Sequence, residues 1–153
     1  TLFRSLLRRR LNALEEKWRT QPQHIEDIEF FWNIKLEAYT RRENIKIFNV
    51  KEESVENTEE LIRKLFVTNL QIPNKDVKNI RFERVHRIPS RAPDRRSSRP
   101  RPVTARFSFY QDKEFVCSFY ENLKGTVIGI ANDFPREIEE IHKTLYSVSK
   151  KAQ

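Results

Sequence analysis

Over the first forty residues, apolar side chains recur at the spacing of a helix face. With Leu11 taken as an a position, most a and d positions of the heptad are apolar, and the register holds across the whole stretch. Since a coiled coil requires such a seam, residues 1–40 are predicted to form a helical oligomerisation segment. The expected contact residues are Leu7, Leu11, Leu14, Trp18, Ile25, Ile28, Trp32 and Tyr39.

Two features qualify this N-terminal helix. Pro22 lacks a backbone N–H and clashes with the preceding turn, so a kink or a boundary between two helices is expected at Gln21–Pro22. Aromatic residues occupy three a positions, which favours a loose or higher-order assembly over a tight dimer. The alternative is a single amphipathic helix that packs on the rest of its own chain.

From residue 44 onward, short runs of β-forming residues alternate with amphipathic helical stretches. Two helices are expected: one over 57–70 that Asn57 caps, and one over 112–124 that ends at Gly125 and buries Phe115. The apolar spacing slips between Phe82 and Val85, which predicts a β-bulge. Strands are expected over residues 44–50, 79–88, 103–109 and 126–131.

The order of these elements, β-α-β-β-α-β, is that of a split βαβ sandwich with a four-stranded antiparallel sheet and both helices on one face. We therefore predict an α+β, ferredoxin-like domain over residues 41–132. Its other sheet face is open, and in a basic chain such a face suggests an RNA-recognition domain. Residues 89–102 are rich in proline and arginine and contain no large apolar side chain, so an exposed mobile loop is expected there. Residues 133–153 predict a helical start of a C-terminal domain, with Ile138, Ile141, Leu145 and Val148 at helical spacing.

The positive charge is concentrated in one segment. The chain has a formal net charge of +8, and the stretch from Arg84 to Arg106 contains eight arginines and one acidic residue, Asp94. A focused basic segment of this kind favours nucleic acid as the partner. The alternative is a basic protein whose charge serves solubility alone.

The two strand motifs of an RNA-recognition domain fall on residues 45–50 and 102–109. Ala105, Phe107 and Phe109 match the inward positions, whereas Lys46, Thr104 and Arg106 occupy positions where base-stacking aromatic residues are expected. Without that stacking, affinity must come from phosphate contacts and guanidinium stacking, which predicts little sequence preference and a strong salt dependence. The alternative is a solvated sheet face in a domain that serves protein contacts.

The sequence gives little reason to expect catalysis, a metal ion, a cofactor or a small-molecule substrate. Cys117 is the only cysteine, the three histidines are scattered, and the two glycines do not form a phosphate-binding loop. His86 is more readily interpreted as a phosphate or base contact than as a catalytic base. The apolar runs are too short to span a membrane, and the first residues are unlike a signal peptide, so we expect an intracellular protein and a fragment of a longer chain.

Several segments, in order, resemble the RNA-binding protein encoded by the first open reading frame of LINE retrotransposons. They are the stretch from Arg41 to Ile47, the acidic turn into Asn57, the stretch from Glu83 to Pro89 with the arginine loop, the stretch from Arg101 to Phe107, and Asp133–Phe134. The resemblance covers residues 30 to 150. It implies a trimeric coiled coil, a non-standard RNA-recognition domain, and a C-terminal domain that completes the binding cleft.

The same resemblance implies that the protein coats its own element's RNA in cytoplasmic ribonucleoprotein particles, with the nucleus as a second compartment, and acts as a nucleic-acid chaperone. The partners implied are single-stranded RNA and DNA and further copies of the chain. The heptad array is shorter than in the family, and the chain stops at the opening of the C-terminal domain, so weaker binding is expected. The residues carried over as nucleic-acid contacts are Arg41, Arg42, Lys46, Arg84, Arg87, Arg91, Arg95, Arg96, Arg99, Arg101, Arg106 and Lys124.

Overall fold

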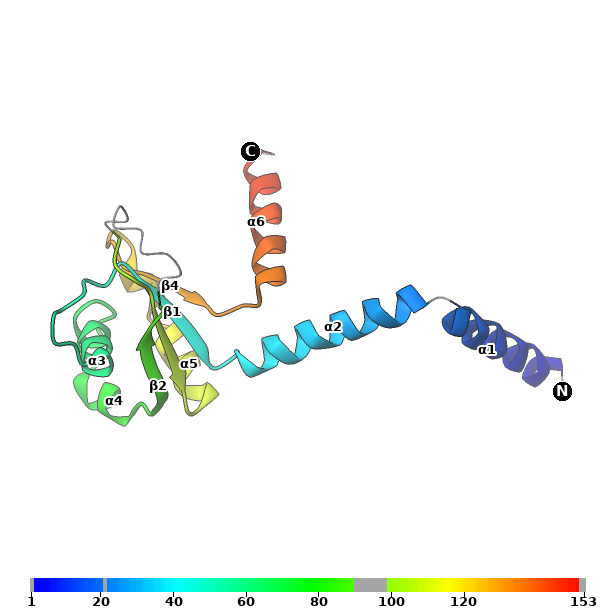
Figure 1. The fold of residues 1–153 in the computed structure, drawn as a ribbon. Coiled ribbons are helices and arrows are strands. Elements are labelled where there is room, and N and C mark those ends of the chain that lie inside the picture. The colour runs from blue at the N-terminus through cyan, green and yellow to red at the C-terminus, as the bar shows by residue number, and fades with distance from the viewer. Residues whose placement is uncertain (1, 21, 90–98, 152–153) are drawn as a thin grey trace. The chain divides into compact units, whose positions relative to one another are not determined.

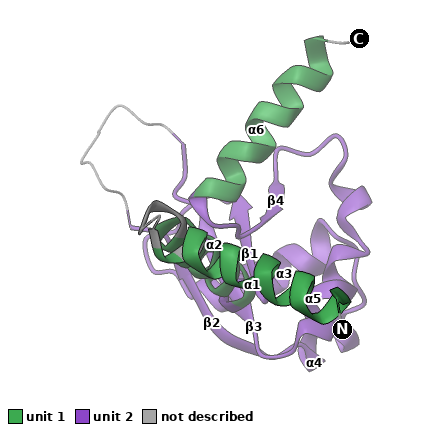
Figure 2. Ribbon diagram, turned by 90° about the vertical axis from the view of Figure 1, so that its right-hand side faces the viewer, with its two compact units in different colours: residues 1–39, 137–153 green, residues 40–136 purple. Residues whose placement is uncertain are grey.

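The computed structural model describes residues 2–20, 22–89 and 99–151, apart from the side chains of residues 18, 20 and 22–24. Two compact units are present, one made of residues 1–39 with 137–153 and the other of residues 40–136 (Figure 2). Arg91, Arg95 and Arg96 lie outside the described residues, as does the side chain of Trp18.

The first unit contributes helices, as the heptad pattern predicted. Helix α1 spans Leu2–Thr20, α2 spans Pro22–Thr40, and α6 spans Arg136–Lys151 (Figure 1). The expected boundary at Gln21–Pro22 is confirmed, since α1 ends at Thr20 and α2 begins at Pro22. Proline is well tolerated at the first position of a helix but not within one.

The second unit is a mixed α/β domain built on a four-stranded antiparallel sheet, as predicted. Its strands lie in the order β2-β3-β1-β4, so β1 and β3 are central. They span Asn44–Phe48 (β1), Phe82–Arg87 (β2), Val103–Phe107 (β3) and Gly129–Asn132 (β4). The helices are α3 (Thr58–Thr68), α4 (Asn74–Asn79) and α5 (Tyr110–Cys117), followed by a 3₁₀ turn over Tyr120–Leu123.

The hydrophobic core lies between one face of the sheet and the helices. Alternate strand residues point into this core, among them Ile45 and Ile47 of β1 and Ala105 of β3, all at 0% exposure. The helices cover them with Ile62, Leu65, Phe66, Val77 and Val116. Because side chains of a strand alternate between faces, the residues in between must point away from the helices. This geometry defines the outer face of the sheet.

Several local predictions are confirmed. Asn57 accepts a hydrogen bond from the backbone N–H of Glu60 and so caps α3. The strand register shifts between Phe82 and Arg84, which is the irregularity that the apolar spacing indicated. Gly125, by contrast, was expected to end the second helix but lies two residues after a 3₁₀ turn, with a φ of 82° that glycine adopts without strain.

Other boundaries were wrong. The first strand ends at Phe48 instead of residue 50, because Asn49 adopts a left-handed conformation with φ 64°. The predicted strand over 79–88 begins only at Phe82, since 74–79 forms the short helix α4. The predicted strand over 126–131 is displaced to Gly129–Asn132.

The second helix differs most from its prediction. It begins at Tyr110 and ends at Cys117, and the rest of the predicted span is a 3₁₀ turn. Phe115 was expected inside but is 38% exposed, with its ring packed edge-on against Phe119. Phe109 was also expected to point inward, but it is 55% exposed because β3 ends at Phe107 and the chain turns there into α5.

Candidate nucleic-acid interface

The strand register places the predicted sheet residues in two adjacent rows of the outer face. Asn44 of β1 and Arg84 of β2 flank Arg106 of β3 in the first row. In the second row, Thr104 lies between Lys46 and His86, and Ala131 of β4 follows Lys46. Paired residues that lie 18 to 85 positions apart in sequence therefore form one surface. We call this surface the sheet face and define it by Asn44, Lys46, Phe48, Arg84, His86, Thr104, Arg106, Gly129 and Ala131.

Two cations of the sheet face, Lys46 and Arg106, lie beside carboxylates and remain partly open to solvent. Arg106 Nε lies 2.7 Å from Glu83 Oε2, and the arginine side chain remains 35% exposed. Arg84, one strand away, is exposed. Arg106 points away from the core, as the alternation with Ala105 and Phe107 requires.

Asp133 directly follows β4 and collects the basic side chains at the edge of the sheet face. Its carboxylate lies 3.1 Å from Lys46 Nζ and 3.3 Å from Arg41 Nη1, and it accepts a hydrogen bond of 3.0 Å from Asn44 Nδ2. Burial acts to raise the pKa of Asp133, but the hydrogen bonds from Asn44 and Lys46 and the nearby cations outweigh it and hold the pKa below its ordinary value. Asp133 is therefore a carboxylate at neutral pH that orients Arg41 and Lys46.

Arg87 was predicted to contact nucleic acid, but its side chain is buried and hydrogen-bonded within the domain. It follows Val85 at a spacing of two residues and so lies on the inner side of β2, where its side chain is only 7% exposed. Its guanidinium donates to both oxygens of Glu56 and to the carbonyls of Val50, Lys51 and Arg101. These five hydrogen bonds occupy all five N–H donors of an arginine, which leaves none for a phosphate.

The arginines that flank residues 90–98 differ from one another. Arg101 pairs with Glu52 through both its Nε and its Nη2 atoms, at 2.9 Å for the closest contact, while 47% of its side chain stays exposed. The side-chain and backbone hydrogen bonds from Arg101 lower the pKa of Glu52 to about 2. Arg99 is exposed. Arg101 thus retains access to solvent although it is paired.

The turn between α2 and β1 adds one further cation, which lies beside the start of helix α5. Arg42 lies 2.7 Å from Glu43 and 5.6 Å from the ring centroid of Tyr110, with 44% of its side chain exposed. The buried Lys113 donates a hydrogen bond to the carbonyl of Arg42 and thereby fixes this turn. Burial lowers the pKa of Lys113. Lys124 caps the end of the 3₁₀ turn and is exposed.

Sequence reasoning missed one aromatic residue of the sheet face. Phe48 lies two residues beyond Lys46 on β1, so both side chains point to the same side, and Phe48 is only partly buried. Its partner across the ladder is Gly129 of β4. The signal was present in the alternation of Ile45 and Ile47, but the motif comparison directed attention to Lys46 alone.

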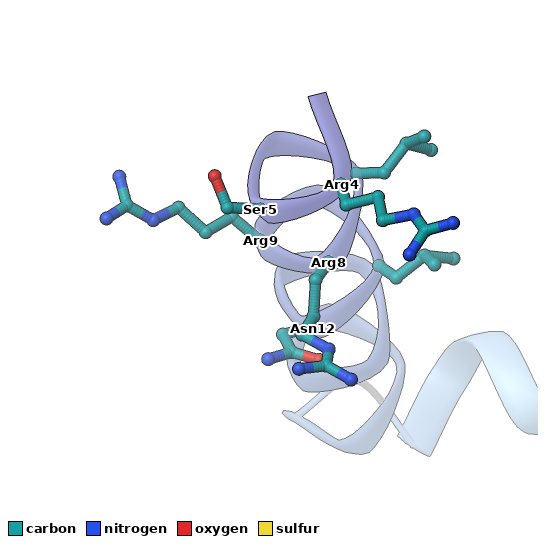
Figure 3. A pocket seen from close by; sticks show the side chains of 7 residues that line it. Arg4, Ser5, Arg8, Arg9 and Asn12 are labelled. Atoms are coloured by element: carbon teal, nitrogen blue, oxygen red, sulfur yellow. The ribbon is translucent and has the colours of Figure 1, made fainter. Parts of the chain in front are cut away.

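The helical unit exposes the residues predicted to oligomerise. Leu7, Leu11 and Leu14 of α1 are 45–55% exposed, and Ile25, Trp32 and Tyr39 of α2 are 48–60% exposed, while Ile28 is partly buried. Helix α1 also carries six basic side chains against Glu15 and Glu16, so its own net charge is +4. Figure 3 shows Arg4, Arg8 and Arg9 projecting from α1, with Arg9 on the opposite side from Arg4.

Within the described part of the chain, no cluster of three or more His, Cys, Asp or Glu residues has the geometry to hold a metal ion. None of the described helices is both long enough and apolar enough to cross a membrane. No protein-family model matches the chain, and no curated protein matches it significantly.

Proposed function

We propose that this protein binds single-stranded RNA and DNA with little sequence preference and acts as a nucleic-acid chaperone. The observation that carries the proposal is the position of Lys46, Arg84 and Arg106 on one sheet face, with Arg41 at its edge. A surface of guanidinium and ammonium groups on a flat sheet suits a flexible phosphate backbone. The basic segment from Arg84 to Arg106 supplies two strands of this sheet.

This proposal includes a fold and an assembly. The element order β1-α3-β2-β3-α5-β4, with the short helix α4 inserted between α3 and β2, supports an RNA-recognition type of ferredoxin-like domain. The central position of β1 and β3 supports it further, because the two motif strands then lie side by side. We propose that the chain is a LINE-type first-open-reading-frame protein, which assembles through its N-terminal helices and functions in a ribonucleoprotein particle.

A salt titration of binding to a fluorescent single-stranded RNA tests the electrostatic basis. Four to six phosphate contacts give a log–log slope of roughly −3 to −4. The double variant Arg84→Gln/Arg106→Gln is expected to make this slope less steep by about 1.4, since each lost contact on a single strand removes about 0.7. A slope near zero for the unmodified protein contradicts the proposal.

The matched control is Lys64→Gln/Lys78→Gln. It removes the same charge from exposed positions on α3 and α4, which belong to the helical layer and not to the sheet face. It is expected to leave the slope nearly unchanged. An equal effect of both double variants indicates that net charge, and not the sheet face, determines binding.

The exposed apolar residues of α1 and α2 favour self-association as a second function. Sedimentation equilibrium of the full chain is expected to give the mass of an oligomer, and Leu11→Gln/Leu14→Gln is expected to reduce that mass, because both leucines are about half exposed at seam positions. A monomer mass for the unmodified protein overturns the coiled-coil proposal. If the protein retains protein partners in a pulldown but shows no affinity for RNA in the binding assay, a protein-interaction module is favoured instead.

A further inference from the structure

We propose that the surface beside Phe48, above Gly129 and Ala131, is a base-stacking site for one nucleobase of a bound single strand. This inference rests on the proposed function and adds to it a specific contact with a base. A purely electrostatic surface contacts only phosphates, whereas an aromatic ring on the same surface distinguishes a nucleotide from a bare phosphate chain.

The orientation of Phe48 follows from its neighbours. Ile45 and Ile47 are fully buried in the core, so the side chains of Lys46 and Phe48 must leave β1 on the opposite side. Phe48 pairs with Gly129, and Lys46 pairs with Ala131. The intervening Ile130 of β4 packs on the core. Strand β4 therefore presents only a glycine and an alanine to the sheet face.

These two small residues leave space beside the phenylalanine ring. A Cβ built on Gly129 would lie 3.8 Å from Phe48 Cβ and 3.9 Å from Phe48 Cδ2, so the ring leans toward this strand. No branched or long side chain of β4 stands on the sheet face next to the ring. A planar base has access to the ring from this side, and β4 is an edge strand of the sheet, which lets the nucleic-acid strand continue past it.

Phe48 is also held in place by the chain that follows it. Asn49 adopts a left-handed conformation, and its Nδ2 donates a hydrogen bond of 2.8 Å to the carbonyl of Val127. This contact ties the end of β1 to the loop that enters β4. A stacking ring gains from such positioning because less conformational freedom is lost when the ligand binds.

The cations of the sheet face supply the charge that a nucleotide needs. Lys46 lies two residues along the strand from Phe48, at a distance of about 7 Å along the backbone. Thr104 and His86 continue the same row across β3 and β2. A base on Phe48 thus places its phosphate near Lys46. This juxtaposition of one aromatic ring with a row of polar and basic side chains favours a nucleic-acid strand over an apolar peptide.

The ring also has a structural use, since an aromatic residue across from a strand glycine shields the backbone of that strand. The two roles make different predictions about ligands. Shielding predicts that Phe48 affects the stability of the domain and has no influence on which oligonucleotide binds. Stacking predicts a preference for oligonucleotides that carry bases.

The test compares two fluorescent ten-nucleotide probes, oligo(U) and an abasic ribose-phosphate chain of the same length, by anisotropy. The unmodified protein is expected to bind oligo(U) about tenfold more tightly than the abasic chain. Phe48→Leu is expected to remove most of this preference and to leave the affinity for the abasic chain unchanged. Gly129→Val, which fills the space beside the ring and keeps Phe48, is expected to do the same.

Phe109→Leu is the matched control, because Phe109 is an exposed phenylalanine of the same unit outside the sheet face. It is expected to keep the full preference for oligo(U). Equal binding of both probes by the unmodified protein, or a preference retained in Gly129→Val, overturns the stacking site while the proposed function stands. If the unmodified protein binds neither probe, the proposed function itself fails. Where Phe48→Leu does not fold, Gly129→Val decides the outcome.

Discussion

The buried pair of Arg87 and Glu56 should stabilise the sheet domain, and Arg87→Met should destabilise it strongly. The methionine keeps much of the aliphatic stem but removes the guanidinium from three backbone carbonyls and from the Glu56 carboxylate. That carboxylate then keeps only the hydrogen bonds from Thr58 Oγ1 and from the backbone N–H of Glu53. The two side chains are 7% and 12% exposed, so water replaces the lost donors only in part. Removal of one partner of a buried ion pair costs about 3–5 kcal/mol of stability. Because Glu56 is slightly exposed, the free energy of unfolding is expected to fall by about 3 kcal/mol.

A loss of this size is large compared with the total stability of a domain of about one hundred residues. It corresponds to a decrease in Tm of about 12–24 °C. Differential scanning calorimetry of the full chain measures this change. The control is Arg84→Met, which alters an exposed arginine on the same strand and is expected to shift Tm by no more than a few degrees.

The pH dependence provides a second measurement of the same pair. The hydrogen bonds from Arg87 hold the pKa of Glu56 below its ordinary value, against the effect of burial. A carboxylate with a lowered pKa stabilises the folded state above the unfolded pKa near 4.5, and this contribution is lost as the pH falls through the folded pKa. The difference in Tm between the unmodified protein and Arg87→Met should therefore shrink between pH 6 and pH 3.

Two results would refute this reasoning. One is a destabilisation below about 1 kcal/mol, because a solvated pair contributes no more than that. The other is a loss of RNA binding by Arg87→Met at a temperature where calorimetry shows it folded, because that result returns Arg87 to the binding surface. Arg87→Lys is expected to be intermediate in stability, since one ammonium group cannot replace a planar guanidinium with five donors.

Two further substitutions test the sheet edge and the turn. Asp133→Asn is expected to tighten RNA binding severalfold at low salt, measured by anisotropy, because Lys46 and Arg41 lose a competing carboxylate. It is also expected to cost about 2 kcal/mol of stability, because the charged hydrogen bonds are weakened. Unchanged affinity argues against these two cations as phosphate contacts. Gly125→Ala is expected to cost about 1 kcal/mol in urea denaturation because its φ is 82°, whereas Gly129→Ala, whose added Cβ makes only ordinary contacts, should remain within about 0.5 kcal/mol of the unmodified protein. Equal costs for both glycines contradict the argument from φ.

The regular parts of the sheet domain could be predicted from sequence because their alternation is strict. Ile45 and Ile47, like Val103, Ala105 and Phe107, leave no choice of face, and all of them are buried as expected. Helix α4 could not be found in this way, since its residues 74–79 include one apolar side chain, Val77, and no period can be read from a single position. The second helix was predicted too long because an apolar pattern does not distinguish an α-helix from a following 3₁₀ turn.

The basic segment shows where charge alone misled the prediction. After the bulge, Val85 and Arg87 share a face, so the sequence already indicated that Arg87 points toward the core. What the sequence could not provide is its partner, since Glu56 is 31 residues away in a turn without any periodic pattern. A count of arginines treats Arg84 and Arg87 as equivalent, whereas the parity of the strand assigns one to solvent and the other to the domain's stability.

The alternation of side chains along each strand also places the cations and the aromatic ring on one surface. Lys46 and Phe48 on β1, Thr104 and Arg106 on β3, and Arg84 on β2 share a face only because β1 and β3 are neighbours and the bulge in β2 has restored its register. If the bulge were absent, Arg84 and His86 would point into the core and Val85 to solvent. Under the proposed function, one extra residue near Glu83 therefore sets how many cations the sheet offers to phosphates. A salt titration tests this, because each contact on a single strand is expected to change the slope by about 0.7.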